Sequence, residues 1–169
     1  YRKADKAVNV KFNGNAYMKK EEDGSLSLVH EDYLTVMAIP YDVPIVGFRN
    51  NTVNTLRLWN AEVNRDFSDY GTMTHEQIQA KKEYRNFVES ITEYLYPDDS
   101  SYEGRRLRLI QEYFFVSAGV QSIVRHYLLA GMDIKDFAKK IAIHINDTHP
   151  AVAVAELMRI LVDEERMDW

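Results

Sequence analysis

The fold is decided by a ten-residue stretch near the end of the chain, IAIHINDTHP, residues 141–150. Its first half, Ile141–Ile145, is apolar and rich in β-branched residues, which predicts a buried strand. Pro150 suits the first turn of a helix, where no amide hydrogen is needed. After it, apolar residues recur at helical spacing. The stretch therefore predicts a strand, a polar turn and a helix with the apolar face Val154, Leu157, Met158 and Leu161.

The polar turn between strand and helix is the candidate functional site. In open α/β sheets, ligands bind at the carboxyl ends of the strands, beside helix amides that favour anions. Asp147 and His149 are expected at that edge. Asp and Thr are also ordinary turn and cap residues, and a His beside a Pro can be a turn residue with its hydrogen bonds satisfied. Spacing alone leaves both interpretations open. His144, inside the predicted strand, is expected to be a hydrogen-bonded structural residue.

Composition excludes several classes of protein. The chain has 169 residues, a net charge of −5 and no cysteine. A general nucleic-acid binder would show a basic stripe, and nothing here ties the fold to an oxidising compartment.

No run is apolar enough to cross a bilayer, and no signal peptide opens the chain, so a cytoplasmic location is expected. Because it starts without Met and stops at Trp169, an internal fragment of a longer protein is expected.

The first third of the chain predicts strands. Apolar residues alternate over Val8–Phe12 and again at Leu26 and Leu28, with the turn signal Asp23-Gly24 and a charged hairpin end between them. Extended sequence continues over Leu34–Ala38. The remaining expectations are a turn-rich segment around Pro40 and Pro44, a strand over Val53–Trp59, and a connecting loop over Asn60–Thr74.

Helical sequence follows. Thr74 and Gln77 predict a capping box, and the helix they open is expected to run to about Tyr94, with Pro97 ending it. A loop from Pro97 to Gly104 precedes a long helix over Arg105–Ala130, which Gly131 closes. The middle of the long helix, Phe114–Val120, is apolar or small on every side and is expected to be buried. Asp133–Lys140 is a short amphipathic piece.

Three blocks of sequence carry a family resemblance. They are INDTHP at 145–150 with ELMR at 156–159 and LVDEER at 161–166; YDVPIVGFRNN at 41–51 with NTLRLW at 54–59; and LYPDD at 95–99 with EG at 103–104, LRL at 107–109 and QEYF at 111–114. In their order along the chain, these blocks resemble the α-glucan phosphorylases, which act on glycogen, starch or maltodextrin. The resemblance implies an α/β fold: residues 1–169 are one segment of the N-terminal, Rossmann-like lobe of a two-lobed (GT-B type) glycosyltransferase, with the strands before Asn60 in one sheet system.

The resemblance also implies an activity. Phosphorylases use orthophosphate to release glucose 1-phosphate from the non-reducing end of α-1,4-glucans, as homodimers that carry pyridoxal phosphate on a lysine outside the region seen here. The segment alone is expected to be inactive. A non-catalytic carbohydrate-binding or scaffold module that shares the lobe is the main alternative. A nucleotide-binding α/β domain is disfavoured, since no Gly-rich fingerprint follows any predicted strand.

Site residues follow from the same resemblance. Asp147 and His149 are placed beside the glucosyl site, and the loop Asp98–Ser100 is a mobile gate with its acid at Asp99. Many relatives carry amides where this chain has Asp98 and Ser100, and a carboxylate accepts hydrogen bonds but does not donate them. Arg108 is placed near the pocket, in contact with the gate or Asp99.

From the residues alone, that loop is a solvated acidic connection and Arg108 a surface residue. Arg125-His126 aligns with paired arginines at a regulatory site of some relatives; only Arg125 is retained, so regulation is not carried over. The helix ending near Tyr94, with Phe87, Ile91 and Leu95, is expected at the subunit interface of the parent dimer.

Overall fold

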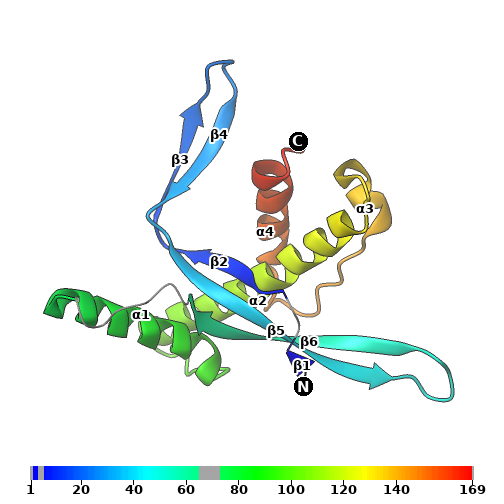
Figure 1. Cartoon of the computed structure of the whole chain (residues 1–169), viewed down its shortest axis with the longest axis horizontal. Coiled ribbons are helices and arrows are strands. Elements are labelled where there is room, and N and C mark those ends of the chain that lie inside the picture. The colour runs from blue at the N-terminus through cyan, green and yellow to red at the C-terminus, as the bar shows by residue number, and fades with distance from the viewer. Residues whose placement is uncertain (1, 4–5, 65–72, 169) are drawn as a thin grey trace. The chain divides into compact units, whose positions relative to one another are not determined.

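The computed structural model describes residues 2–3, 6–64 and 73–168, which form two compact units (Figure 1). The first unit comprises Tyr1–Val10 and Thr35–Gln111, and the second comprises Lys11–Leu34 and Glu112–Trp169. Strands and helices occur in the same chain, so the expected mixed α/β character is confirmed. Whether both units belong to one lobe of a larger protein stays a prediction.

The sheet of the first unit is built around one long strand. It contains β1 (Arg2–Lys3), β2 (Val8–Phe12), β5 (Leu34–Val46) and β6 (Val53–Val63), in the order β1-β5-β2, with β6 also paired to β5. β5 and β6 run antiparallel, from Val36 opposite Val63 to Val46 opposite Val53. The alternation predicted over Val8–Phe12 is confirmed, because Val8, Val10 and Phe12 are buried and the residues between them are exposed.

The prediction that Pro40 and Pro44 interrupt regular structure is wrong. β5 continues through both, with Pro40 opposite Trp59 and Pro44 opposite Thr55. Proline removes one ladder donor but leaves its carbonyl, and two prolines four residues apart face the same side of a strand. The long partner β6 therefore still holds the segment extended. β6 also runs on to Val63, past the predicted start of the loop; residues 65–72 of that loop lie outside the described residues.

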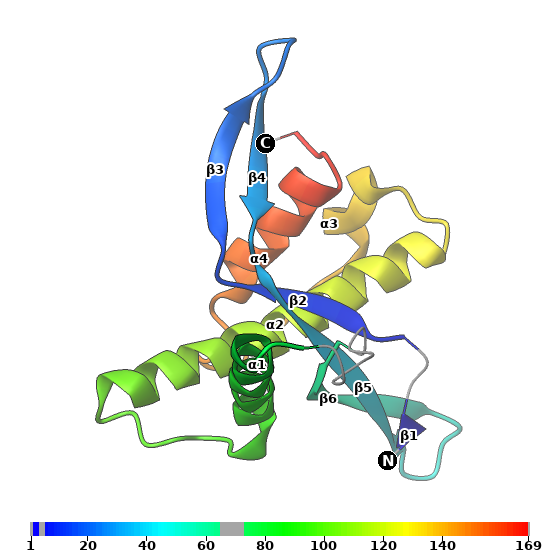
Figure 2. The same ribbon diagram turned by 60° about the vertical axis from the view of Figure 1, so that its left-hand side comes forward.

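The predicted hairpin end is confirmed, but its first strand is Asn15–Lys20 and not the predicted run Val8–Phe12, and the hairpin forms a sheet of its own. β3 (Asn15–Lys20) and β4 (Leu26–Glu31) pair antiparallel from Asn15 opposite Glu31 to Lys20 opposite Leu26 (Figure 2). At its end the Gly24 amide donates to the Glu21 carbonyl at 3.0 Å, and Gly24 has a φ of +86°. The expectation of a single sheet system for all strands before Asn60 is thus wrong, because these two strands pair only with each other among the described residues.

Helix α1 (His75–Glu93) packs against β6 within the first unit. The predicted capping box opens it: the Thr74 hydroxyl accepts from the Gln77 amide at 3.3 Å, and the Gln77 side chain accepts from the Thr74 amide at 2.9 Å. Val88 and Ile91 are its buried residues. Hence the buried face of α1 is covered within its own unit.

The second unit is organised around the long helix α2 (Tyr102–Leu129), whose first residues belong to the other unit. It begins three residues earlier than predicted and is followed by Gly131, at a φ of +75°. The short piece predicted next is a 3₁₀ turn, η2 (Ile134–Asp136), and one helical turn, α3 (Phe137–Lys140). The core of this unit consists of Val116, Val120, Val124, Tyr127, Phe137, Ala153 and Ile160.

The buried strand predicted over Ile141–Ile145 is not formed. Ile141 has an extended backbone, with φ −114° and ψ 131°, but no described segment pairs with residues 141–146. Ile145 and His144 are exposed, so the expectation of a structural His144 inside a strand is also wrong. A strand needs a neighbouring backbone for its N–H and C=O groups, and periodicity reports the tendency to be extended without supplying that neighbour.

The predicted helix after Pro150 is present, and its predicted apolar face is confirmed in part. α4 (Ala153–Arg159) continues into a π-helical turn, η3 (Ile160–Glu164). Of the predicted face, Leu157 and Leu161 pack against the core, whereas Val154 and Met158 are exposed. The buried residues are Ala153, Glu156 and Ile160. Among the helices of the described residues, none is both long enough and apolar enough to span a bilayer.

Candidate functional site

The turn at Asp147 is held by its own side chain. Asp147 has a φ of +67°, in the left-handed region that Asp tolerates better than most residues. Its Oδ1 accepts from the Thr148 amide at 2.6 Å and from the Thr148 hydroxyl at 3.3 Å. The Thr148 amide, and next the charge of His149, lower the pKa of Asp147 below its ordinary value. Asp147 is therefore an ionised carboxylate at neutral pH.

His149 stands between two carboxylates. Its Nε2 lies 3.5 Å from Oδ2 of Asp147, and its Nδ1 lies 3.6 Å from Oε1 of Glu112 on α2. Both distances are too long for a good hydrogen bond. The two contacts become ion pairs only when the imidazole is protonated. The side chain is 54% exposed. The turn thus presents an accessible imidazole flanked by acceptors.

A chain of backbone hydrogen bonds ties this turn to α4. The Ala151 amide donates to the Thr148 carbonyl at 3.0 Å, and the Ala153 amide donates to the Pro150 carbonyl at 2.9 Å. One turn later the Glu156 amide donates to Val152 at 3.0 Å. The position of His149 is therefore set by the position of α4.

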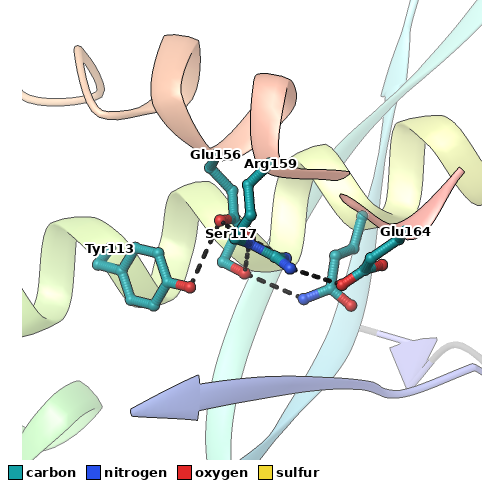
Figure 3. Close-up of polar contacts among 6 residues, drawn as sticks. Tyr113, Ser117, Glu156, Arg159 and Glu164 are labelled. Carbon is teal, nitrogen blue, oxygen red and sulfur yellow. Dashed lines mark hydrogen bonds and ion pairs between the residues drawn. The ribbon is translucent and has the colours of Figure 1, made fainter. Parts of the chain in front are cut away.

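Glu156 on α4 is a buried carboxylate with four hydrogen bonds (Figure 3). Oε1 accepts from the Ser117 hydroxyl at 2.6 Å and from Nη2 of Arg159 at 2.9 Å. Oε2 accepts from Nε of Arg159 at 2.7 Å and from the Tyr113 hydroxyl at 3.4 Å. Tyr113 and Ser117 lie on α2, so a single side chain of α4 binds two successive turns of α2. Only 3% of Glu156 is exposed, and the paired bonds offset the cost of burying its charge.

The remaining members extend this network outward. Nη1 of Arg159 contacts Oε1 of Glu164 at 2.6 Å, and Gln121 donates to the Ser117 hydroxyl at 3.0 Å. Hydrogen bonds to Glu156 raise the pKa of Arg159, and burial followed by the charge of Glu156 raises the pKa of Tyr113. The sequence did not predict this network, because Glu156 and Arg159 were considered only as part of the ELMR block. The signal was present, because Ala153, Glu156 and Ile160 share helical spacing.

In the first unit, the loop before α2 is held by the start of that helix. Oδ1 of Asp98 accepts from the Ser100 amide at 3.0 Å, and this hydrogen bond lowers the pKa of Asp98. Nη1 of Arg105 donates to the carbonyls of Asp99, at 3.3 Å, and Ser100, at 3.0 Å. The sequence reasoning missed Arg105, which holds the loop backbone and leaves the side chains of Asp98, Asp99 and Ser100 exposed.

Arg108 and Gly104 complete this region. The Arg108 guanidinium lies 4.6 Å from the centre of the Tyr96 ring, a cation–π distance. Tyr96 is exposed and has a φ of +58°. A Cβ added at Gly104 would lie 1.8 Å from the Asp98 carbonyl oxygen, so only glycine allows the loop to approach the helix this closely.

Comparison with known proteins identifies the family. The family model described as Carbohydrate phosphorylase matches residues 1–169. The chain belongs to the carbohydrate phosphorylase family. Glycogen phosphorylase of Bacillus subtilis (strain 168) is 47% identical over 168 residues, which are 99% of this chain and 20% of that protein. The muscle form of glycogen phosphorylase from Homo sapiens is 47% identical over 146 residues, which are 82% of this chain and 17% of that protein. The phosphorylase segment thus spans about a fifth of the length of these relatives.

Within the phosphorylase segment, the expected site residues fall into two groups. Asp147 and His149 lie together in the second unit, with Glu112. The loop Asp98–Ser100 and Arg108 lie in the first. That the two groups line one pocket stays a prediction. Arg125 is partly buried, and His126 is exposed in the last turn of α2. The described residues contain no group of His, Cys, Asp and Glu side chains suited to a metal ion.

Proposed function

We propose that this segment belongs to an α-glucan phosphorylase. Orthophosphate attacks C1 of the terminal glucosyl unit, the bond from C1 to the glycosidic oxygen breaks, and that oxygen leaves as the 4-hydroxyl of the shortened glucan after taking a proton. The products are glucose 1-phosphate and a glucan one unit shorter. One observation carries the proposal: the family match covers residues 1–169, and the relatives are named glycogen phosphorylase.

In this proposal Asp147 and His149 bind and orient the terminal sugar. Sugar hydroxyls both donate and accept, and an ionised carboxylate beside an exposed imidazole offers partners for both. The left-handed backbone of Asp147 and its bonds to Thr148 fix this arrangement before a sugar arrives. Such preorganisation lowers the cost of ordering the site on binding.

The loop Asp98–Ser100 is proposed as a mobile gate over the catalytic site. Its exposed side chains and its attachment through Arg105 support a segment that moves as a unit with the start of α2. Asp98 and Ser100 replace amides of many relatives, so their contacts to sugar hydroxyls differ in kind: Asp98 only accepts. Arg108 is proposed to line the pocket from its place above Tyr96.

Pyridoxal phosphate is proposed as the cofactor, bound outside this segment. The exposure of the lysines supports a site elsewhere: of the lysines whose exposure is described, all except Lys81 are exposed, whereas a lysine that forms a Schiff base is normally activated by a desolvated pocket or a neighbouring charge. When bound, the cofactor supplies a phosphate group for proton transfer. The 169 residues alone are expected to release no glucose 1-phosphate.

The larger assembly is proposed to be a two-lobed glycosyltransferase of the GT-B type, forming a cytoplasmic homodimer. Val88 and Ile91 of α1 are buried in their own unit, so a subunit contact through this helix has to use its other faces and the exposed Leu95 that follows it. Light scattering on the full-length protein tests the dimer. A monomer at micromolar concentration contradicts it.

The activity is tested with the full-length protein that carries this segment. Incubation with maltodextrin and orthophosphate is expected to yield glucose 1-phosphate, with the absorbance of bound pyridoxal phosphate in the protein. Release of free glucose independent of phosphate contradicts phosphorolysis. Glucan binding with neither product nor cofactor absorbance favours the alternative, a non-catalytic carbohydrate-binding or scaffold module.

A further inference from the structure

The long helix α2 contacts the segment 147–164 at two points in the second unit. At the first, Glu112 faces Nδ1 of His149 at 3.6 Å. At the second, Tyr113 and Ser117 donate to the buried carboxylate of Glu156 (Figure 3). Tyr113 and Ser117 are four residues apart and therefore share one face of α2. The first contact is long and exposed, whereas the second is buried and includes a short bond of 2.6 Å from Ser117.

The second contact is rigidly coupled to the first. Three backbone hydrogen bonds of 2.9–3.0 Å connect Thr148 to Ala151, Pro150 to Ala153 and Val152 to Glu156. Over this stretch the chain has little freedom to bend without losing one of these bonds. A rotation or slide of α4 along α2 would therefore carry His149 with it.

The hydrogen bonds of Glu156 fix that rotation. Arg159, on the next turn of the same helix, holds both carboxylate oxygens, so the carboxylate plane is fixed relative to α4. In this orientation Oε1 accepts from the Ser117 hydroxyl at 2.6 Å. An apolar residue at this position would bury equally well but would not select one angle, because hydrophobic contact is non-directional.

We infer that Glu156 is a positioning residue for the sugar pocket, setting the place of His149 through α4. The inference rests on the proposed function of His149 but makes a separate claim, that the geometry of the turn depends on the bond between Glu156 and Ser117. Because Glu156 is buried, it acts through the backbone that joins it to His149.

The positional claim is tested by hydrogen exchange in the full-length protein. Glu156→Gln removes the charge that holds Arg159, and Ser117→Ala removes the donor on α2 while leaving Glu156 and Arg159 paired. Both are expected to speed amide exchange over residues 147–153 at least fivefold, with α1 unchanged. Glu164→Gln is the matched control: it removes the charge from only the outer contact of Arg159, and exchange at the turn should stay within twofold of wild type. Unchanged exchange in Ser117→Ala overturns the inference even if Glu156→Gln fails to fold.

The functional claim is tested by a double-mutant cycle with His149→Ala. Ser117→Ala is expected to raise KM for maltodextrin about five- to thirtyfold with a smaller change in kcat, and this effect should fall below twofold in the His149→Ala background. If Ser117→Ala raises KM by the same factor with His149 and with Ala at position 149, its role is merely structural and the inference is overturned. If His149→Ala alone leaves the kinetics unchanged while Ser117→Ala still speeds exchange at the turn, the positional coupling stands and the proposed role of His149 is contradicted.

Discussion

The Ser117 hydroxyl donates a 2.6 Å hydrogen bond to Oε1 of Glu156, a carboxylate of which only 3% is exposed. The bond joins α2 to α4 inside the core of the second unit. Burying a carboxylate is costly unless its lone pairs are occupied, and here Arg159 and Tyr113 provide the other partners. The polar network therefore stabilises one particular packing of the two helices.

Glu156→Leu is expected to destabilise the protein. It leaves Arg159 with its contact to Glu164 and leaves Ser117 without its acceptor. We expect a loss of about 3 kcal/mol in the free energy of unfolding, near the lower end for a broken buried pair, because Arg159 is 31% exposed and can still reach water. Denaturant unfolding of wild type and Glu156→Leu measures this loss.

The double variant Glu156→Leu/Arg159→Met is the control for that experiment, since it leaves no buried charge unpaired: Glu164, which loses Arg159, has a side chain that is 46% exposed. It should recover at least half of the lost stability. A double variant as unstable as Glu156→Leu alone would show that the cost arises from packing and not from the broken pair.

Two glycines of α2 are expected to respond to alanine in opposite directions. Gly104→Ala places a Cβ 1.8 Å from the Asp98 carbonyl oxygen, so the loop Asp98–Ser100 must move. Gly119→Ala meets no atom within 4 Å and removes backbone freedom from the unfolded chain. We expect Gly104→Ala to lower the free energy of unfolding by about 1–3 kcal/mol and kcat/KM at least tenfold, and Gly119→Ala to add about 0.5–1 kcal/mol with activity unchanged. Equal responses would contradict the close approach at Gly104.

The lowered pKa of Asp147 predicts a pH dependence of stability. The group keeps its charge in the folded state to lower pH than in the unfolded chain, where the pKa is about 3.9. Its contribution is therefore fully present above that value and is lost as the pH falls through the lower folded pKa. To remove the imidazole charge, the comparison is made in a His149→Ala background: the difference in Tm between His149→Ala and His149→Ala/Asp147→Asn should be constant from pH 7 to pH 5 and shrink below pH 4. Thr148→Ala, which keeps the amide donor, should retain most of this pH dependence; a difference that grows toward acid would contradict the assignment.

Local features were well predicted from the sequence because their causes are local. The capping box at Thr74 and the hairpin turn at Gly24 depend on residues a few positions apart. The burial of Phe114–Val120 followed from a helix that is apolar or small on every side. None of these predictions required knowledge of the distant segment that packs against these residues.

The larger misses in the fold concern partners distant in the sequence. Ile141–Ile145 has strand-forming residues but no described neighbour to pair with, and Pro40 stays in a strand because β6 lies opposite it. Glu156 was not recognised as buried because its burial depends on Ser117, 39 residues away. In the candidate site, Asp147 and His149 were found through the motif, whereas Glu112 and Arg105 become visible only in three dimensions.

The central claim is that the turn at Asp147 and His149 belongs to the sugar pocket of a phosphorylase. It is tested most directly by the kinetics of Asp147→Asn and His149→Ala in the full-length protein, with maltodextrin and orthophosphate as substrates. Both should lower kcat/KM by roughly ten- to a thousandfold, about 1.4–4 kcal/mol on the barrier, with the cofactor content unchanged, because residues that bind and orient the sugar do not hold the cofactor. Full activity in both variants would show that the turn is only structural, and loss of cofactor or of folding would show that it belongs to the framework of the protein.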